Sequence, residues 1–274
     1  MNIGCHVSIA GGIFNAPQRA FDLGAECFQI FTRSPQGGKA PELTSEVLEK
    51  FSTEMKKNKL TNFVVHTPYY INFASANNRI RYGSISVVRD ELERASLLGA
   101  KYVMTHLGSA GELSENEATE KVSEMLIKAL EGYTGSTELL IENSAGAGKI
   151  IGATFTQIAE IIKTVNHPRL NGICIDTQHS FASGYDWRDF EKTLAQIDSE
   201  IGLEKIKLIH TNDSMTECAS HKDRHAHIGE GLIGATAFQK IVAFAEKQNV
   251  DMILETEHEK VMTDITLLKS FRGK

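Results

Sequence analysis

The stretch at residues 207–234 reads KLIHTNDSMTECASHKDRHAHIGEGLIG. It begins within a short apolar run, residues 206–209, that stops abruptly at His210. The motif Asp223-Arg224-His225 follows, and alternation along an extended chain places its two end residues on the same side of the backbone. Carboxylate and imidazole groups that converge from one loop are donors that a zinc-class ion binds. A lone histidine in such a loop is more often an ordinary polar residue, so the interpretation depends on whether the pattern recurs.

The pattern does recur along the chain. Short, continuous apolar runs typical of buried parallel strands end in residues that could bind a metal ion. The six residues at these ends are His66, His106, Glu142, Asp176, His210 and Glu255. Successive members lie between 34 and 45 positions apart, which leaves room for a crossover helix between each pair of strands.

Helical segments are expected between these runs. Ser114 with Glu117, and Thr154 with Gln157, have the form of capping boxes, and Asp186 is a plausible N-cap. Eight strand–helix units without a break in composition predict a single (β/α)₈ barrel domain over residues 1–274. An open, doubly wound sheet is the structural alternative, but no G-x-G-x-x-G motif follows the first strand. The helices are expected at residues 15–23, 45–58, 84–98, from 115, from 155, from 187, 236–248 and 261–271.

Composition limits the classes of protein to consider. The 274 residues are 41% hydrophobic and 23% charged, as in ordinary globular proteins. The net charge of −6 does not by itself indicate a nucleic-acid-binding protein, although bound cations would reverse the sign locally. Four cysteines without a C-x-x-C pair are typical of buried thiols in a reducing cytoplasm. No signal peptide or membrane-spanning run is evident, so we expect a cytoplasmic protein without membrane contacts.

Strand ends at the carboxyl side of a barrel are where barrel enzymes assemble their active sites. His179, Asp223 and His225 are expected on the loops directly above the six strand-end residues. Five histidines and four carboxylates are too many donors for one ion but suit a cluster of two or three. The sequence therefore predicts a polynuclear metal site.

Several segments together resemble a known family. They are Gly4-Cys5-His6-Val7-Ser8, Ile175-Asp176-Thr177-Gln178-His179, His210-Thr211-Asn212-Asp213-Ser214, and Asp223-Arg224-His225 with Gly229-Glu230-Gly231. Their order and spacing are similar to those of the endonuclease IV family of abasic-site DNA repair nucleases, over nearly the whole chain.

The resemblance implies a (β/α)₈ barrel with three zinc ions per chain. Glu142 would bridge two of them and serve as the central catalytic ligand. One of the bridged ions would also bind His66 and His106, and the other would bind Asp176, His210 and Glu255. The third would bind His179, Asp223 and His225.

The activity implied is hydrolysis of the phosphodiester 5′ to an abasic site in double-stranded DNA, during base excision repair. The products would be a 3′-hydroxyl and a 5′-deoxyribose phosphate, with additional cleaning of blocked 3′ ends by a monomeric enzyme. Candidate DNA contacts are His6, Arg33, Gln36, Tyr69 and Arg224. The loop at residues 35–39, PQGGK, departs from the longer wedge of the family, so Tyr69 is expected to be the main residue that enters the duplex.

Two other functions remain open from the residues alone. A metal-dependent sugar isomerase or epimerase could use the same type of barrel. Such sites hold one or two ions, which would leave His179, Asp223 and His225 without a shared role. A binding module stabilised by metal, without catalysis, would have little use for so many ligands at open strand ends.

Overall fold

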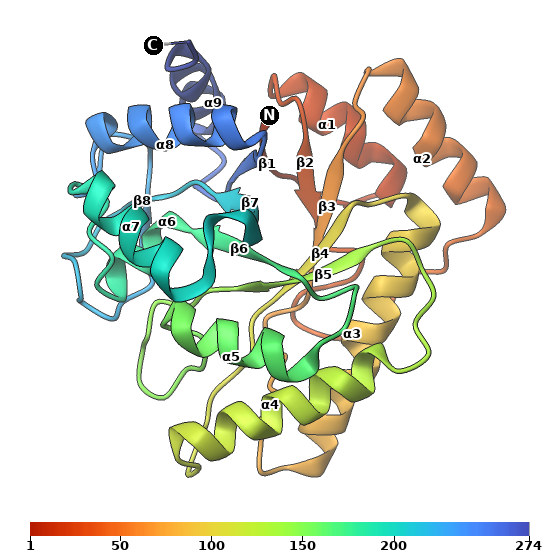
Figure 1. The fold of residues 1–274 in the computed structure, drawn as a ribbon. Helices are drawn as coiled ribbons and strands as arrows, with labels where there is room; N and C mark the ends of the chain where they lie inside the picture. The colour runs from red at the N-terminus through yellow and green to blue at the C-terminus, as the bar shows by residue number, and fades with distance from the viewer. Residues whose placement is uncertain (274) are drawn as a thin grey trace.

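Eight short strands surround a central axis and are enclosed by helices (Figure 1). The computed structural model describes residues 1–273. The barrel strands are β1 (Ile3–His6), β2 (Phe28–Ile30), β3 (Phe63–His66), β4 (Tyr102–Thr105), β5 (Glu138–Glu142), β6 (Gly172–Asp176), β7 (Ile206–His210) and β10 (Asp251–Leu254). All neighbouring pairs are parallel, and the ring closes in the order β1, β10, β7, β6, β5, β4, β3, β2. The predicted (β/α)₈ barrel is confirmed, and the open sheet is excluded.

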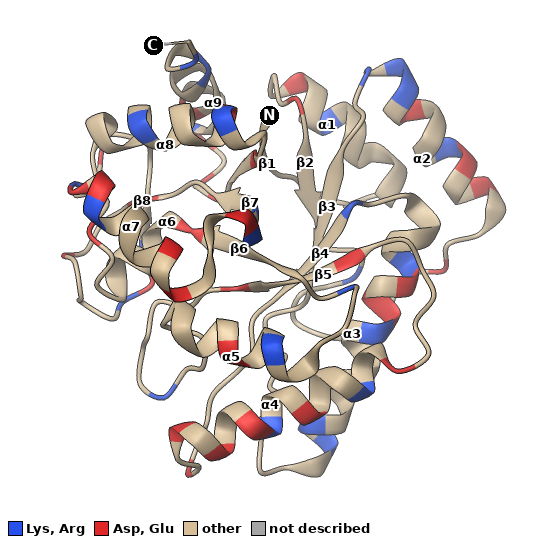
Figure 2. Ribbon diagram, viewed as in Figure 1, with Lys and Arg blue, Asp and Glu red and all other residues tan. Residues whose placement is uncertain are grey.

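The helices follow the strands in sequence and pack around them. Most charged residues lie on these helices and on loops (Figure 2). The helical segments are η1 (Ile13–Asn15), α1 (Ala16–Asp22), α2 (Ser45–Lys57), α3 (Asn78–Leu98), α4 (Glu115–Leu130), α5 (Phe155–Val165), α6 (Thr177–Ala182), α7 (Phe190–Ile201), η2 (Leu203–Lys205), α8 (Ala235–Gln248) and α9 (Val261–Ser270). Within residues 1–273, no helix is both long and apolar enough to cross a bilayer.

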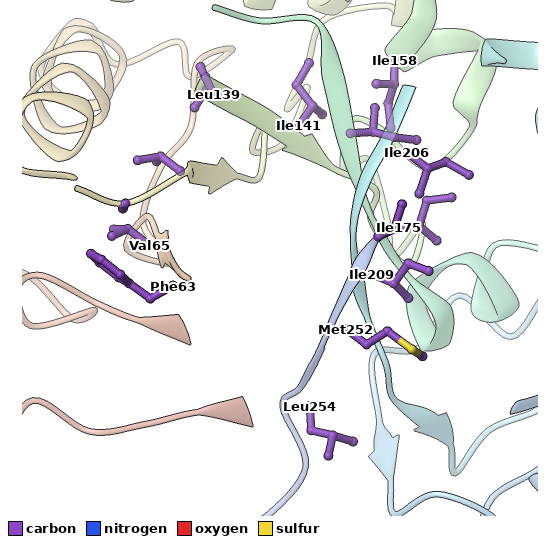
Figure 3. Packing of buried hydrophobic residues seen from close by; sticks show 14 of the residues in the cluster. Phe63, Val65, Leu139, Ile141, Ile158, Ile175, Ile206, Ile209, Met252 and Leu254 are labelled. Carbon is purple, nitrogen blue, oxygen red and sulfur yellow. The ribbon is translucent and has the colours of Figure 1, made fainter. Parts of the chain in front are cut away.

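The strands are buried on both faces, which explains their continuous apolar sequences. Side chains on one face, such as Val65, Ile141 and Ile175, pack against the surrounding helices (Figure 3). Alternate residues on the same strands, such as Val64 and Leu140, belong to a separate buried cluster. Successive side chains of a strand point to opposite faces, and both faces are packed. This packing holds each strand in one orientation. Polar residues at the strand ends are therefore held on a rigid scaffold.

Three local expectations differ from the structure. Helix α3 begins at Asn78 rather than at residue 84, because the side chain of Asn77 caps the helix by accepting from the Arg79 N–H. Asp186 is not the cap of α7: Asp189 occupies that position, and Asp186 instead binds Arg188. Short helix α6 was not expected.

The two capping boxes were predicted in full, but the structure confirms only one completely. Ser114 and Glu117 bond reciprocally at the start of α4. Thr154 accepts from the Gln157 N–H as expected, whereas the Gln157 side chain accepts from the backbone of Gly152. Both arrangements satisfy backbone N–H groups at the start of a helix or in the loop before it.

A small antiparallel pair organises the loop between β7 and α8. Its strands are β8 (Asp213–Ser214) and β9 (His225–Ala226), and they pair Asp213 with Ala226 and Ser214 with His225. The pairing brings His225 back to the level of Ser214, only four residues after the end of β7. Asp223, on the loop that joins the two strands, is thereby held beside His225.

Candidate metal centre

The six strand-end residues predicted from the sequence converge at one end of the barrel. Parallel register explains part of this convergence, because Asp176 at the end of β6 lies opposite His210 at the end of β7. The ligand atoms of the six residues fall into two groups that share Glu142, within each of which the atoms lie no more than 4.8 Å apart. The first group is His66, His106 and Glu142; the second is Glu142, Asp176, His210 and Glu255.

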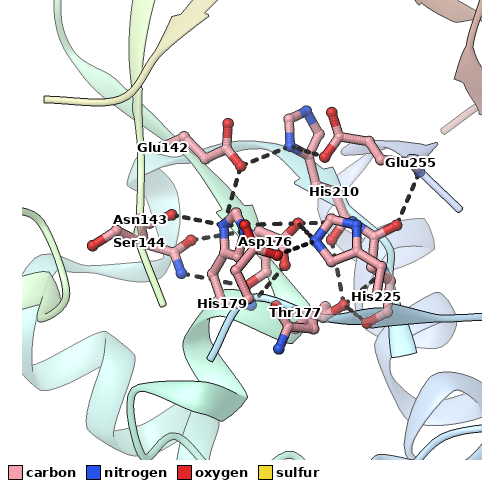
Figure 4. Close-up of polar contacts among 12 residues, drawn as sticks. Glu142, Asn143, Ser144, Asp176, Thr177, His179, His210, His225 and Glu255 are labelled. Carbon is pink, nitrogen blue, oxygen red and sulfur yellow. Dashed lines mark hydrogen bonds and ion pairs between the residues drawn. The ribbon is translucent and has the colours of Figure 1, made fainter. Parts of the chain in front are cut away.

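Glu142 contacts four histidines, and Figure 4 shows its contacts with His179 and His210. Its Oε2 atom is 3.1 Å from His66 Nε2 and 3.5 Å from His106 Nε2. Its Oε1 atom is 3.0 Å from His210 Nδ1 and 3.4 Å from His179 Nδ1. Each oxygen therefore faces a different pair of rings, which is the arrangement that a carboxylate bridging two cations requires.

The electrostatics favour a negatively charged carboxylate at this central position. Burial raises the pKa of Glu142, but the adjacent His106 and His210 outweigh it and hold that pKa well below its usual range. Burial lowers the pKa of His179, but Asp176 and Asp223 raise it by more, to well above its ordinary value. Protons on histidines such as His179 can balance the charge of the carboxylates. Divalent cations can take the place of those protons, because metal binding to imidazole displaces them.

A third group lies beside the first two, and its ligand atoms come from Asp176, His179 and His225. Helix α6 positions His179: Asp176 caps the helix by accepting from the His179 N–H at 2.8 Å. The exposed Asp223 also contacts this group, with Oδ2 3.3 Å from His179 Nε2 and Oδ1 3.4 Å from His225 Nε2. The structure thus brings together all three residues predicted for this group and adds Asp176.

One buried atom indicates that these residues suit a metal ion. His225 Nε2 is buried and makes no hydrogen bond within the described chain, although carboxylate oxygens of Asp176 and Asp223 lie 3.6 Å and 3.4 Å away. A buried polar atom without a partner is costly, and a cation between these oxygens and the ring nitrogen would satisfy it. The mixture of imidazole and carboxylate donors fits a zinc-class ion.

Two asparagines that sequence reasoning missed hold Asp176 in place. Asn212 Nδ2 donates to Asp176 Oδ2 at 2.7 Å, and Asn143 Oδ1 accepts from the Asp176 N–H at 2.7 Å. Asn212 Oδ1 also accepts from the Glu255 N–H at 2.9 Å. Hydrogen bonds of this kind orient metal ligands. Their position beside the strand ends, directly after Glu142 and two residues after His210, was the available signal.

The glycine-rich turn after His225 serves the site indirectly. Asp213 is fully buried and accepts from the N–H groups of Gly229, Gly231 and Ile233, at 2.9, 3.2 and 2.9 Å. A Cβ atom at Gly231 would lie 2.5 Å from Asp213 Oδ1, so no larger residue fits there. This tight turn fixes the loop that follows β9, the strand that carries His225.

The centre opens into a cavity of roughly 740 Å³ that is lined by ligands on one side and apolar side chains on the other. His66, His106 and Glu142 form part of its floor. Tyr70, Ile80 and Ile150, exposed by 39%, 46% and 41%, line its apolar side. Such a combination suits a ligand with an anionic group and an apolar face.

The predicted DNA contacts occupy different environments. Tyr69 is 68% exposed on the cavity rim, and its ring meets Phe31 edge-on with centroids 5.2 Å apart. Gln36 and Arg224 are exposed, and His6 is half-buried against the cavity. Arg33 differs from the expectation, because its guanidinium is buried and bound to Glu91 and Asp90 on α3. That ion pair anchors the loop after β2 and leaves Arg33 poorly placed to reach a phosphate.

A further buried polar residue, Gln29 on β2, was missed as well. It is fully buried, and its amide contacts His6, His210 and Glu255. The only signal in the sequence was one amide within the apolar run at residues 27–31.

Comparison with known proteins agrees with this geometry. The model of the family described as xylose isomerase-like TIM barrel matches residues 17–271. "Probable endonuclease 4" of Cenarchaeum symbiosum (strain A) is 35% identical, covering 100% of this chain and 99% of the relative. "Probable endonuclease 4" of Halothermothrix orenii is 37% identical, covering 93% of each.

Solved structures give the same result. The crystal structure of endonuclease IV from Thermus thermophilus has a TM-score of 0.88 and 30% identity, and covers 99% of this chain and 98% of that one. A D-tagatose 3-epimerase-like protein has a TM-score of 0.75 at 22% identity, covering 99% and 97%, and this likeness shows the shared fold alone. Because these relatives match over nearly their full length and share the barrel, the chain belongs to the endonuclease IV family within the xylose isomerase-like TIM barrels.

Proposed function

We propose that this protein is a zinc-dependent endonuclease that cleaves DNA on the 5′ side of abasic sites in base excision repair. The products would be a 3′-hydroxyl and a 5′-deoxyribose phosphate. The observation that carries the proposal is the set of three adjoining ligand groups on the floor of one open cavity. Family membership supports a DNA substrate, because the relatives are named as endonucleases.

The ligand groups suggest how three ions would be held. His66 and His106 would hold one, and Asp176, His210 and Glu255 would hold the second, with Glu142 shared between them. His179, His225 and Asp223 would hold the third. When bound, ions of this class activate water as a nucleophile and stabilise the entering and leaving oxygens of an in-line displacement.

The protein's own residues have distinct tasks around the phosphodiester. One carboxylate oxygen of Glu142 faces His66 and the other faces His210. The carboxylate thus sets the distance between the first and second ligand groups. Asp176 lies within ligand distance of two groups and is held by two asparagine side chains. Asp223, whose side chain is 60% exposed, closes the outer side of the centre nearest to solvent. The ligands are thus ordered from the buried floor to the open mouth.

An abasic nucleotide must leave the duplex to reach this floor. Extrusion of a nucleotide costs a few kcal/mol and costs least where no base pair is lost, which favours an abasic site. The exposed ring of Tyr69 stands on the rim, where it can fill the space left in the stack. The same centre would accept a blocked 3′ terminus, which needs no extrusion, and we infer that it also cleans such ends.

Sugar isomerisation or epimerisation is the competing function. That chemistry on a small sugar would not need the outer group of His179, His225 and Asp223. It would also not explain an apolar rim that includes an exposed Tyr69. We expect the active form to be a monomer, because every ligand group is complete within one chain.

Incubation with duplex DNA that carries one abasic analogue tests the proposal directly. With zinc-loaded protein, a denaturing gel should show a single cut immediately 5′ to the analogue, and an intact duplex of the same sequence should remain uncut. A second duplex with a 3′-phosphate at a nick tests end cleaning. No cleavage by folded protein that binds zinc, together with turnover of a ketohexose, would establish the competing function.

A further inference from the structure

Gln29 is a neutral residue that contacts two ligands of the centre, His210 and Glu255, and also His6. Its side chain projects from β2 and is fully buried. Nε2 lies 2.6 Å from Glu255 Oε1 and 3.1 Å from His6 Nδ1, while Oε1 lies 2.7 Å from His210 Nε2. The amide group of Gln29 therefore forms hydrogen bonds through both its nitrogen and its oxygen, all to residues at the barrel mouth.

The direction of each hydrogen bond follows from chemistry. The ionised carboxylate of Glu255 can only accept, so the amide group beside it must be the NH₂. The carbonyl oxygen of Gln29 then faces His210 and can itself only accept. Nε2 of His210 must therefore carry a hydrogen.

This hydrogen determines which ring nitrogen of His210 is free to bind a cation. In a neutral imidazole with hydrogen on Nε2, the lone pair is on Nδ1. Nδ1 faces the second ligand group, 3.0 Å from Glu142 Oε1 and 3.2 Å from Glu255 Oε2. The opposite tautomer would direct an N–H into the space where a cation would lie.

We propose that Gln29 is a positioning residue that fixes the tautomer of His210, and thereby the affinity of the group formed by Glu142, Asp176, His210 and Glu255 for its ion. This inference rests on the proposed metal-binding function. Gln29 also holds the Glu255 carboxylate, so it orients two ligands of the same group. His66 and His106 of the first group make no hydrogen bond with the Gln29 side chain in the described structure.

The same amide sets the tautomer of His6. Both hydrogens of the Gln29 NH₂ group are used, one on Glu255 and one on His6 Nδ1, so Nδ1 of His6 accepts. The hydrogen of the neutral His6 ring is then on Nε2. His6 lines the cavity together with Glu255, and an N–H donor there suits a phosphate oxygen of the substrate.

Two substitutions separate the functions of the amide. Gln29→Met keeps the length of the side chain and removes the acceptor for His210 as well as the donors to Glu255 and His6. Gln29→Glu keeps an acceptor for His210 but places a second negative charge beside Glu255. Zinc affinity is measured by competition with a chromophoric chelator. The tautomer is read from long-range ¹H–¹⁵N spectra of zinc-loaded, histidine-labelled protein, with His210 assigned through a His210→Asn variant.

Gln29→Met should weaken the binding of one zinc ion about 10- to 100-fold, as loss of a partner that orients a ligand does, and leave the other ions in place. In this variant the hydrogen of His210 should no longer be fixed on Nε2. In Gln29→Glu it should stay on Nε2, because the carboxylate still accepts from that nitrogen. Wild-type affinity and tautomer in Gln29→Met would overturn the proposal. If that variant does not fold, a shift of the hydrogen to Nδ1 in Gln29→Glu would overturn it.

A matched control excludes general loosening of the barrel. Gln157 on α5 also bridges two groups, accepting from the Gly152 N–H at 2.7 Å and donating to Thr119 Oγ1 at 3.2 Å. Gln157→Met should lower the melting temperature but leave zinc affinity unchanged; equal weakening of zinc binding by this control would refute a specific role of Gln29.

Failure of the proposed function and failure of the role of Gln29 give different results. If wild-type protein binds no zinc, the proposed function fails. If it binds zinc and Gln29→Met binds equally well, only the role of Gln29 fails.

Discussion

The side chains of Asp176 and Asn212 are fully buried and joined by a 2.7 Å hydrogen bond between Oδ2 and Nδ2. Because Asn212 Oδ1 also accepts from the Glu255 N–H, one amide links the ligand segments that follow β6, β7 and β10. Asn212→Ala should lower zinc affinity about 10- to 100-fold. It should also reduce the free energy of unfolding by about 1–3 kcal/mol, because buried groups lose their partner. Chelator competition and urea denaturation measure the two effects.

The same substitution at Asn171 provides the control. Asn171 is exposed and accepts from Lys205 Nζ far from the centre. Asn171→Ala should change neither quantity measurably. Equal behaviour of the two variants would contradict a role of Asn212 in the ligand set.

Glu142→Gln tests the central carboxylate. The substitution preserves size but removes the charge that faces His66, His106, His179 and His210. We expect cleavage of an abasic duplex to fall by more than about 100-fold. Mutation of a residue that only hydrogen-bonds to a metal ligand already lowers metal affinity or activity about 10- to 100-fold. Lys222→Ala, at an exposed site on the loop beside Asp223, should retain most activity. Near-normal cleavage by Glu142→Gln would show that this carboxylate does not bridge two ions.

Metal removal should act on activity and stability together. We expect purified protein to hold about three zinc-class ions, consistent with its three ligand groups. Prolonged chelation should abolish cleavage. It should also lower the melting temperature, because the ions bind the folded state and not the unfolded chain. Elemental analysis and calorimetry before and after chelation measure this. Full activity with one ion or none would exclude the trinuclear arrangement.

Tyr69 and Gln36 should differ in their effect on DNA binding. Tyr69 presents a rigid ring that is braced against Phe31, whereas Gln36 precedes two glycines with positive φ values, Gly37 and Gly38. Tyr69→Ala should therefore weaken binding to an abasic duplex severely without changing metal content, and Gln36→Ala should matter less. Fluorescence anisotropy titrations at several salt concentrations compare them, and affinity should fall with salt as counterions are displaced. A larger loss from Gln36→Ala would show that the short loop enters the duplex.

An ion pair far from the centre predicts a pH dependence of stability. Burial raises the pKa of Glu26, but Arg272 and the Ile3 N–H outweigh it and lower that pKa from 4.5 to about 2. A carboxyl with a depressed pKa stabilises the fold above its unfolded pKa, and this contribution is lost as pH falls from 4.5 toward 2.

Glu26→Gln should therefore destabilise the protein near neutral pH, by no more than about 1 kcal/mol because the pair is partly exposed to solvent. The difference from wild type should shrink as pH falls below 4.5 and approach zero below about pH 2, where the carboxyl is protonated in both states. Urea denaturation of chelated proteins at several pH values tests this without interference from metal loss. A difference that stays constant with pH would exclude the ion pair as its cause.

The barrel and most of the centre could be predicted because both depend on local patterns. Each buried strand is a continuous apolar run, and a ligand such as Glu142 or Asp176 at its end interrupts that run visibly. The topology then brings these ends together without further information. The addition of Asp176 to the outer group could not be predicted in this way, since it depends on how α6 turns His179 back toward the strand end.

Residues whose role depends on distant partners were not predictable. Arg33 was expected to contact DNA, but its partner Glu91 lies 58 positions away on a helix whose start was itself misplaced. Gln29 is a single amide in an apolar strand, and its partner His210 is 181 positions away. Neither relationship leaves a periodic or local trace in the sequence.

Closure of the ring also limits how this protein can meet a partner. Because β1 pairs with both β2 and β10, the barrel sheet has no free strand edge to which another chain could add a strand. A partner would therefore contact loops and helices, such as the loops around the mouth, rather than extend the barrel sheet. Changes in those loops would alter what the cavity admits, while the six strand-end ligands stay at the ends of strands that the ring holds in register.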